Sequence, residues 1–255
     1  MHPNTLFLLA AVLALNAQAL AQHYYYAPNS VHIPLLMEKN NASFGAGLGW
    51  GTDFNAFEVQ GVYSPIPHGA VMFNYFNTGS KDIEQGDELG TRFRFAELAA
   101  GAYQALEHGS ASVFAGVGQG RLYNNYGSEN FSRFTLRRWF VQPSLAYRDH
   151  LFQCGVALRL SRLAYPKGES SFDIEEEDLA AIRKIEEDAP FFLPELGLTG
   201  SVRLSPFVLT VNLTSVFPDM EGLHFSRFNT NLTLAFDFGE LARRHKGKAA
   251  NATGN

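Results

Sequence analysis

Apolar and polar residues alternate along most of the chain between residues 41 and 238. In the segment 152–161, Phe152, Val156 and Leu160 fall on one face, and the positions between them are small or polar. Successive side chains of a β-strand point to opposite sides, so this period of two predicts strands rather than helices. We predict about ten strands, at 41–50, 54–64, 70–77, 91–103, 112–121, 133–147, 152–161, 193–204, 207–214 and 231–238.

The connections between these strands alternate in length. Tight turns are predicted at 65–68, 107–110, 148–150 and 205–206, and longer polar loops at 79–90, 122–132, 165–190 and 217–227. The turn histidines His68, His108 and His150 recur at intervals of about 40 residues, the length of two strands with their connections. The pattern predicts an all-β fold, a closed up-and-down antiparallel barrel whose strands are long enough to cross a membrane.

One segment departs from the period of two. Residues 173–188 carry apolar side chains at helical spacing, among them Leu179, Ile182 and Ile185, on an otherwise acidic segment. We predict an acidic helix in the longest, extracellular loop. Its apolar stripe packs on the mouth of the barrel as a lid, or its carboxylates hold divalent cations, bind lipopolysaccharide through them, or cap a pore.

The two ends of the chain differ from the barrel in composition. Residues 1–21 contain an apolar run, Leu6–Leu15, followed by small residues up to Ala21, which predicts a cleaved secretory signal peptide. Residues 22–40 form a periplasmic lead-in or a plug that enters the barrel, residues 41–238 the barrel, and residues 239–255 a basic, disordered tail.

Charge and cysteine content narrow the chemistry. The formal net charge is -5, with no basic face of the kind that phosphate backbones require, so we expect no nucleic-acid partner. Cys154 is the only cysteine, which precludes an internal disulfide. The turn histidines are spread around the predicted barrel and form no tight cluster with other ligands, so we expect neither a metal nor a cofactor.

The face opposite the aliphatic residues is predicted to line the lumen. On this assignment Arg92 and Arg94 point inward opposite Phe93 and Phe95, while Phe134 points outward. The interior charges either line a narrow conducting lumen or pair with one another and fill it as a salt-bridged core. The predicted lumen-lining residues are Glu58, Gln60, Arg92, Arg94, Arg159, Glu195, Arg203, Asn212, Asn231 and Asp237.

The alternation, the asymmetry of the loops and the aromatic strand ends at Tyr63, Tyr103, Tyr147 and Trp139 make residues 41–238 similar to the small outer-membrane β-barrel proteins of Gram-negative bacteria. The last strand ends Phe236-Asp237-Phe238, which resembles the aromatic-terminated signal of that family. The resemblance implies residence in the outer membrane, contact with outer-membrane lipid and lipopolysaccharide, and insertion by the barrel-assembly machinery. Any small-molecule ligand stays open.

A non-catalytic role, structural, binding or narrow passive channel, is the function that these features favour. The alternative is a lipid A-modifying enzyme. His224 and Ser226 are spaced as in the active site of lipid A deacylases, in which a histidine activates a serine nucleophile, and by parity both side chains share the lipid-facing side. A soluble periplasmic, lipocalin-like barrel that binds a ligand is the other alternative, and it would have its aliphatic face inside.

Overall fold

The computed structural model describes residues 23–51, 54–80, 82–84, 87–127, 130–171, 176–217 and 223–239, with the backbone alone at 82–84, 87–88 and 177. The predicted signal peptide, residues 1–21, and all but the first residue of the predicted tail therefore lie outside the described residues. The strands are β1 (Ala42–Gly51), β2 (Asn55–Ile66), β3 (Gly69–Gly79), β4 (Asp82–Glu84), β5 (Asp87–Leu106), β6 (Gly109–Gly127), β7 (Asn130–Arg148), β8 (Phe152–Ser170), β9 (Phe191–Leu204), β10 (Phe207–Val216) and β11 (Phe228–Asp237), and the helix is α2 (Glu176–Asp188).

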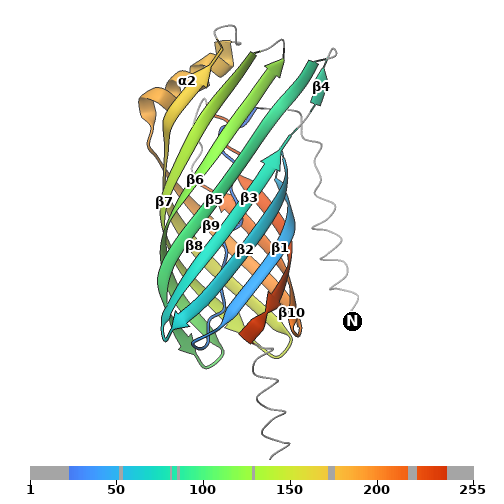
Figure 1. The fold of residues 1–255 in the computed structure, drawn as a ribbon, viewed down its shortest axis with the longest axis vertical. Helices are drawn as coiled ribbons and strands as arrows, with labels where there is room; N and C mark the ends of the chain where they lie inside the picture. The colour runs from blue at the N-terminus through green and yellow to red at the C-terminus, as the bar shows by residue number, and fades with distance from the viewer. Residues whose placement is uncertain are drawn as a thin grey trace, which may run out of the picture.

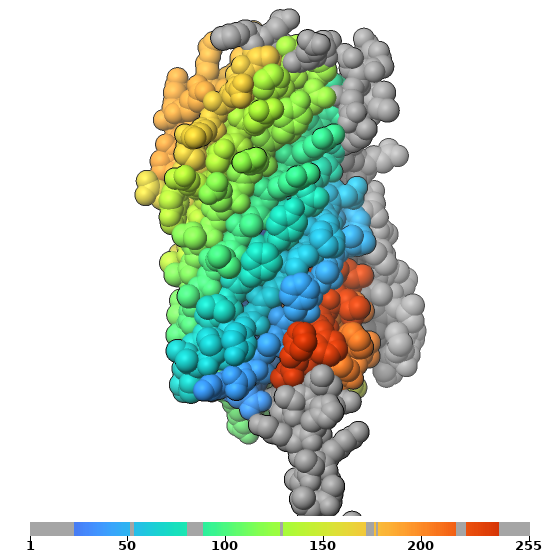
Figure 2. Space-filling model, in the orientation of Figure 1, coloured from blue at the N-terminus to red at the C-terminus, as the bar shows by residue number. Residues whose placement is uncertain are grey.

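All the described strands except the short β4 form one closed antiparallel barrel. Each pairs with its neighbour in sequence, the first and last strands β1 and β11 pair along nine positions, and β3 pairs with β5 across the short β4. The predicted fold, a closed barrel of ten antiparallel strands with one short helix, is thus confirmed. Figure 1 shows the tilted strands, and Figure 2 shows that their side chains make a continuous wall over the face of β1, β2, β3, β5 and β6.

The two ends of the barrel differ, as the loop lengths predict. We call the end with the tight connections after β2, β5, β7 and β9 the turn end, and the end that carries α2 and β4 the loop end (Figure 1). Strands β5 to β8 are longer than predicted and project at the loop end. The predicted loop at 122–132 is largely strand, because β6 continues to Gly127 and β7 begins at Asn130, where the Tyr123 and Phe131 rings stack 6.1 Å apart. The polar residues of this stretch predicted a loop, but β6 and β7 stay paired through it. Backbone pairing there does not require apolar side chains.

The N-terminal segment, residues 23–40, runs through the lumen from one end to the other. At the loop end the His23 side chain lies 2.9 Å from the carbonyl oxygen of Asn125 on β6. At the turn end the backbone N–H of Asn40 donates to the carbonyl of Ser64 on β2. Of the two roles predicted for residues 22–40, the structure therefore has the plug, and the first described residue lies at the opposite end from the end of β11.

The packing inside the barrel forms three layers along this segment. Tyr24, Tyr25 and Tyr26 lie in a large aromatic cluster at the loop end, and Val31, Ile33 and Leu36 join apolar clusters nearer the turn end. Between them lies a polar layer, described below. Glycines on the inner face of the wall make room for the segment: a Cβ atom at Gly197 would lie 2.5 Å from Cβ of Val31.

The facing of two strands differs from the prediction. In β5 Phe93 and Phe95 are buried in the interior, and in β7 Phe134 and Leu136 are buried there too. The prediction placed these residues outward because it assigned the apolar face of every strand to the outside of the barrel and the polar face to the lumen. The tyrosines of the N-terminal segment and the apolar side of α2 are their apolar partners inside.

Among the described residues, no helix has the length and apolar character needed to cross a membrane.

We expect Gly197→Ala to reduce the free energy of unfolding by about 1–3 kcal/mol, because the added methyl group overlaps Val31 in a packed lumen. Gly200→Ala is the matched control on the same strand, since no atom lies within 4 Å of a Cβ there. Urea denaturation of the folded protein measures both. Equal midpoints for the two variants would contradict the packing of the N-terminal segment against β9.

Candidate functional site: the plugged lumen

Two glutamates and two arginines from four strands form a buried ion-pair network at the centre of the lumen. Glu97 comes from β5, Arg138 from β7, Arg159 from β8 and Glu195 from β9. Arg159 Nε donates to Glu195 at 2.5 Å, Arg138 Nε donates to Glu97 at 2.9 Å, and Arg138 Nη1 and Arg159 Nη1 each lie 3.5 Å from the other glutamate. The charges balance, so the network satisfies itself without solvent, as a buried charge cluster must.

The N-terminal segment is part of this network. Asn29 Nδ2 donates to Glu97 at 2.6 Å, and Asn29 Oδ1 accepts from both arginines. The Tyr26 hydroxyl donates to Glu195 at 2.7 Å and also contacts Arg138 Nη1. The plug is therefore held by charge-assisted hydrogen bonds, which are stronger than those between neutral groups.

Glu58 on β2 holds the plug from the other side of the lumen. Its carboxylate is fully buried and accepts from the backbone N–H of Ser30 at 2.8 Å, from Asn229 Nδ2 at 3.0 Å and from Gln60 Nε2 at 3.0 Å. No described Lys, Arg or His side chain makes an ion pair with Glu58. A buried carboxylate without a cation depends on its donors, and one of the three belongs to the plug.

The loop end of the lumen is closed by aromatic and aliphatic side chains. Ala181, Ile182 and Ile185 of α2 pack into the same cluster as the tyrosines of the N-terminal segment. The helix predicted at 173–188 is thus observed from residue 176, and its apolar stripe covers the mouth as the lid interpretation requires. The Tyr25 hydroxyl donates to Asp178 at 3.1 Å, and burial raises the pKa of Tyr25 far above its usual value, so this donor keeps its proton.

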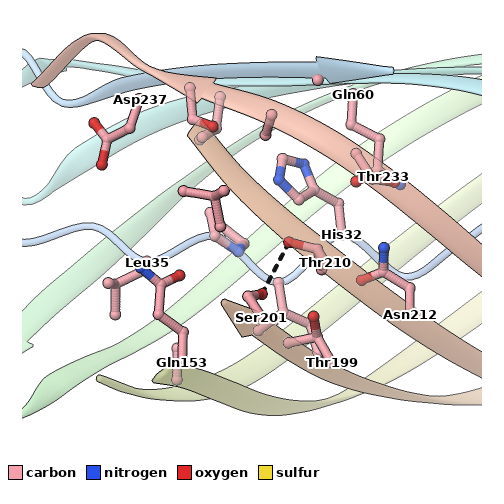
Figure 3. A pocket seen from close by; sticks show the side chains of 18 of the residues that line it. His32, Leu35, Gln60, Gln153, Thr199, Ser201, Thr210, Asn212, Thr233 and Asp237 are labelled. Atoms are coloured by element: carbon pink, nitrogen blue, oxygen red, sulfur yellow. Dashed lines mark hydrogen bonds between the residues drawn. The ribbon is translucent and has the colours of Figure 1, made fainter. Parts of the chain in front are cut away.

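A cavity of about 90 Å³, lined by both polar and apolar side chains, lies between the N-terminal segment and the strands toward the turn end. Figure 3 shows His32 and Leu35 reaching it from the segment, and Ser201, Thr210 and Asn212 reaching it from the wall, with the Ser201 and Thr210 hydroxyls 2.9 Å apart. His32 Nδ1 and Asn212 Nδ2 are buried without a hydrogen-bond partner. We expect a cavity of this size and polarity to be hydrated.

Most of the predicted lumen-lining residues lie in the interior. They are Glu58, Gln60, Arg159, Glu195, Arg203, Asn212 and Asn231, all buried, together with Asp237, which is half-buried at the turn end beside the cavity.

The prediction is wrong for Arg92 and Arg94, which are exposed on the outer face of β5. Alternation is unbroken from Arg92 to Glu97, so once Glu97 points inward the two arginines point outward. No bulge in the pairing of β5 with β3 or β6 shifts this phase.

Sequence reasoning missed Glu97, Arg138, Asn29 and Tyr26. Glu97 and Arg138 follow from the alternation once the facing of their strands is known. Phe93, Phe95 and Glu97 lie on one face of β5 without a break, and so do Phe134, Leu136 and Arg138 on β7. Nothing near Asn29 or Tyr26 in the sequence marks them, since Arg138 is 109 positions from Asn29.

Ser226 does not share a lipid-facing side with His224, contrary to the prediction, because it is buried inside the barrel. Ser226 is 1% exposed, its Oγ atom is buried without a hydrogen-bond partner, and its backbone N–H donates to the carbonyl of Tyr26. The two residues flank Phe225, which forms a parallel bridge with Tyr26. The segment pairs with the plug, and the Ser226 hydroxyl makes no hydrogen bond to a described base.

Within the described ranges, no group of three or more His, Cys, Asp and Glu side chains is placed to hold a metal ion. No protein-family model matches this chain, and no curated protein matches it.

We expect Arg138→Ala to reduce the free energy of unfolding by about 3–5 kcal/mol, because it leaves Glu97 and Glu195 short of a buried counter-charge. Its neighbour Arg137 is exposed, so Arg137→Ala is the matched control, with a change within about 0.5 kcal/mol. Urea titration of the folded barrel, followed by gel mobility before and after heating, measures both. A similar loss for the two variants would argue against the assigned facing of β7.

Proposed function

We propose that the protein is an integral β-barrel of a Gram-negative outer membrane, closed by its own N-terminal segment, with a structural or binding role and no catalytic one. The observation that carries the proposal is the distribution of polarity. Large apolar side chains cover the outside of the barrel, and the charged residues Glu58, Glu97, Arg138 and Glu195 lie inside it. A water-soluble barrel has the opposite arrangement.

The outer surface supports insertion in lipid. Leu98 is 63% exposed, Leu48 57% and Val117 54%, and comparable residues lie on every strand of the barrel. A continuous apolar surface of this extent is unfavourable in water, whereas in a bilayer it is matched by the acyl chains. Closure of the barrel leaves no strand edge with unpaired backbone groups in that environment.

Aromatic residues at the borders of the apolar surface are consistent with this placement. Tyr63 and Tyr147 are exposed toward the turn end and Trp139 toward the loop end, where amphipathic rings meet the headgroups of a bilayer. Tyr103 differs from the prediction. It is buried, and its hydroxyl lies 2.9 Å from Ser64 Oγ inside the barrel.

A lipocalin-like function is less well supported. Such a barrel keeps an open apolar cavity for its ligand, whereas here the N-terminal segment and an ion-pair network fill the lumen, and the cavity of about 90 Å³ beside the segment has a mixed polar and apolar lining. The same filling argues for a barrel that conducts poorly, so among the roles considered we favour a structural or binding one over a passive channel.

The membrane location is tested by fractionation. We expect the protein to sediment with outer membranes, to resist extraction by sodium carbonate, and to migrate faster on a denaturing gel before heating than after it, because a closed barrel resists detergent unfolding. A periplasmic soluble protein and a known outer-membrane protein are the controls. Recovery in the soluble periplasmic fraction would overturn the proposal.

The plug is tested by conductance in planar bilayers. We expect the whole protein to give little steady current, and deletion of residues 23–37 to give a larger one, because the segment fills the lumen and carries partners of Glu58 and Glu97. Deletion of 176–188 is the matched control, since it removes the α2 lid and leaves the plug.

Heat-dependent gel mobility selects the folded variants before the recording. A steady current from the intact protein, or equal currents after the two deletions, would contradict closure by the N-terminal segment.

A further inference from the structure

Four arginines form a row on the outside of the barrel. Arg94 on β5, Arg121 on β6, Arg137 on β7 and Arg162 on β8 are all exposed. Arg94 and Arg121 are direct cross-strand partners. Arg121 is opposite Thr135, two positions from Arg137. Arg162 is opposite Trp139, again two positions from Arg137, so each arginine is a direct or diagonal neighbour of the next. We call these four residues the arginine row.

No carboxylate among the described residues pairs with this row. Like charges directly opposite each other on a sheet are destabilising, and Arg94 and Arg121 are such a pair. None of the four makes an ion pair with a described carboxylate, whereas Arg133, farther out on β7, lies 3.8 Å from Glu169. An anion from outside would therefore reduce the repulsion between these neighbouring charges.

The row marks the border of the apolar surface. On the turn-end side of the arginines, the outward residues of the same strands are apolar, among them Leu98 on β5, Val117 on β6, Val141 on β7 and Leu160 on β8, each at least 37% exposed. An anion held by the row thus has an apolar wall directly beneath it. Trp139, opposite Arg162 and 45% exposed, lies at this border.

The spacing points to more than one anionic group. Neighbouring strands lie about 4.8 Å apart, so a row across four strands spans roughly 14 Å or more. Arginine is suited to phosphate because its planar guanidinium group donates two parallel hydrogen bonds. These strands run side by side in the barrel, and β5, β6 and β7 cross the face seen in Figure 1.

We propose that the arginine row binds the phosphates of an acylated glycolipid that carries two phosphate groups, the chemistry of the lipid anchor of lipopolysaccharide, while its acyl chains lie on the apolar wall below. The inference rests on the proposed function and on the expectation that the long loops are extracellular, which together put the loop end of the barrel in the outer leaflet. It adds a defined lipid site on one sector, β5 to β8, of a protein whose formal net charge is -5.

Binding is tested with the full chain purified from membranes in a zwitterionic detergent. The probes are a bis-phosphorylated lipid A, the same lipid after enzymatic removal of both phosphates, and inorganic phosphate. We expect the phosphorylated lipid to bind at least about tenfold more tightly than the dephosphorylated one, and inorganic phosphate to compete only weakly, because it lacks the acyl chains.

The variant Arg121→Gln with Arg137→Gln removes two charges of the row, and Lys39→Gln with Arg227→Gln removes two exposed charges elsewhere. We expect the first pair to lose the preference for phosphate and the second to keep it, at equal heat-dependent mobility. A preference unchanged in the first pair, or tight binding of inorganic phosphate alone, would overturn the lipid site and leave the membrane barrel standing. Absence of the protein from the membrane fraction would overturn both.

Discussion

The structure depends on the neutralisation of charge inside a closed barrel. Glu97, Arg138, Arg159 and Glu195 come from four different strands, and no solvent shell is available to them at the centre of the lumen. They are tolerated because they pair with one another and because the plug completes their hydrogen bonds through Asn29. The wall and the plug therefore stabilise each other. The wall supplies the charged side chains, and the plug supplies the neutral hydrogen-bond donors and acceptors that complete their hydrogen bonds in place of water.

The same requirement orders the rest of the lumen. Toward the loop end the plug carries tyrosines, which pack against phenylalanines of the wall and under the apolar side of α2. Toward the turn end it carries aliphatic residues, which fit against inner-face glycines such as Gly155 and Gly197. The cavity beside His32 is one part of the lumen that this filling leaves open. One short segment therefore packs against the wall in every layer of the lumen.

The fold was predictable because its signal is local and repeated. Alternation and the contrast between turns and loops predict the strand number, the antiparallel order and the acidic helix without knowledge of any distant contact. The facing of β5 and β7 was not predictable from the same signal, because a strand assignment shifted by one residue exchanges its two faces. Arg137 and Arg138 are adjacent, yet one belongs to the outer surface and the other to the buried network. The inward facing of Arg138 is matched by its contacts with Tyr26 and Asn29 of the plug, which lie more than a hundred residues away in sequence.

The path of the N-terminal segment constrains how the barrel can assemble. The seam of the ring joins β1 to β11, the first strand to the last, so the ring closes only when the end of the chain has been delivered. Residues 23–40, which precede β1, have been delivered before that point. To thread three consecutive tyrosines through a finished lumen past the ion pairs would break those contacts, so closure around the segment is the more direct route. The N-terminal segment would then already be in place while the strands pair around it.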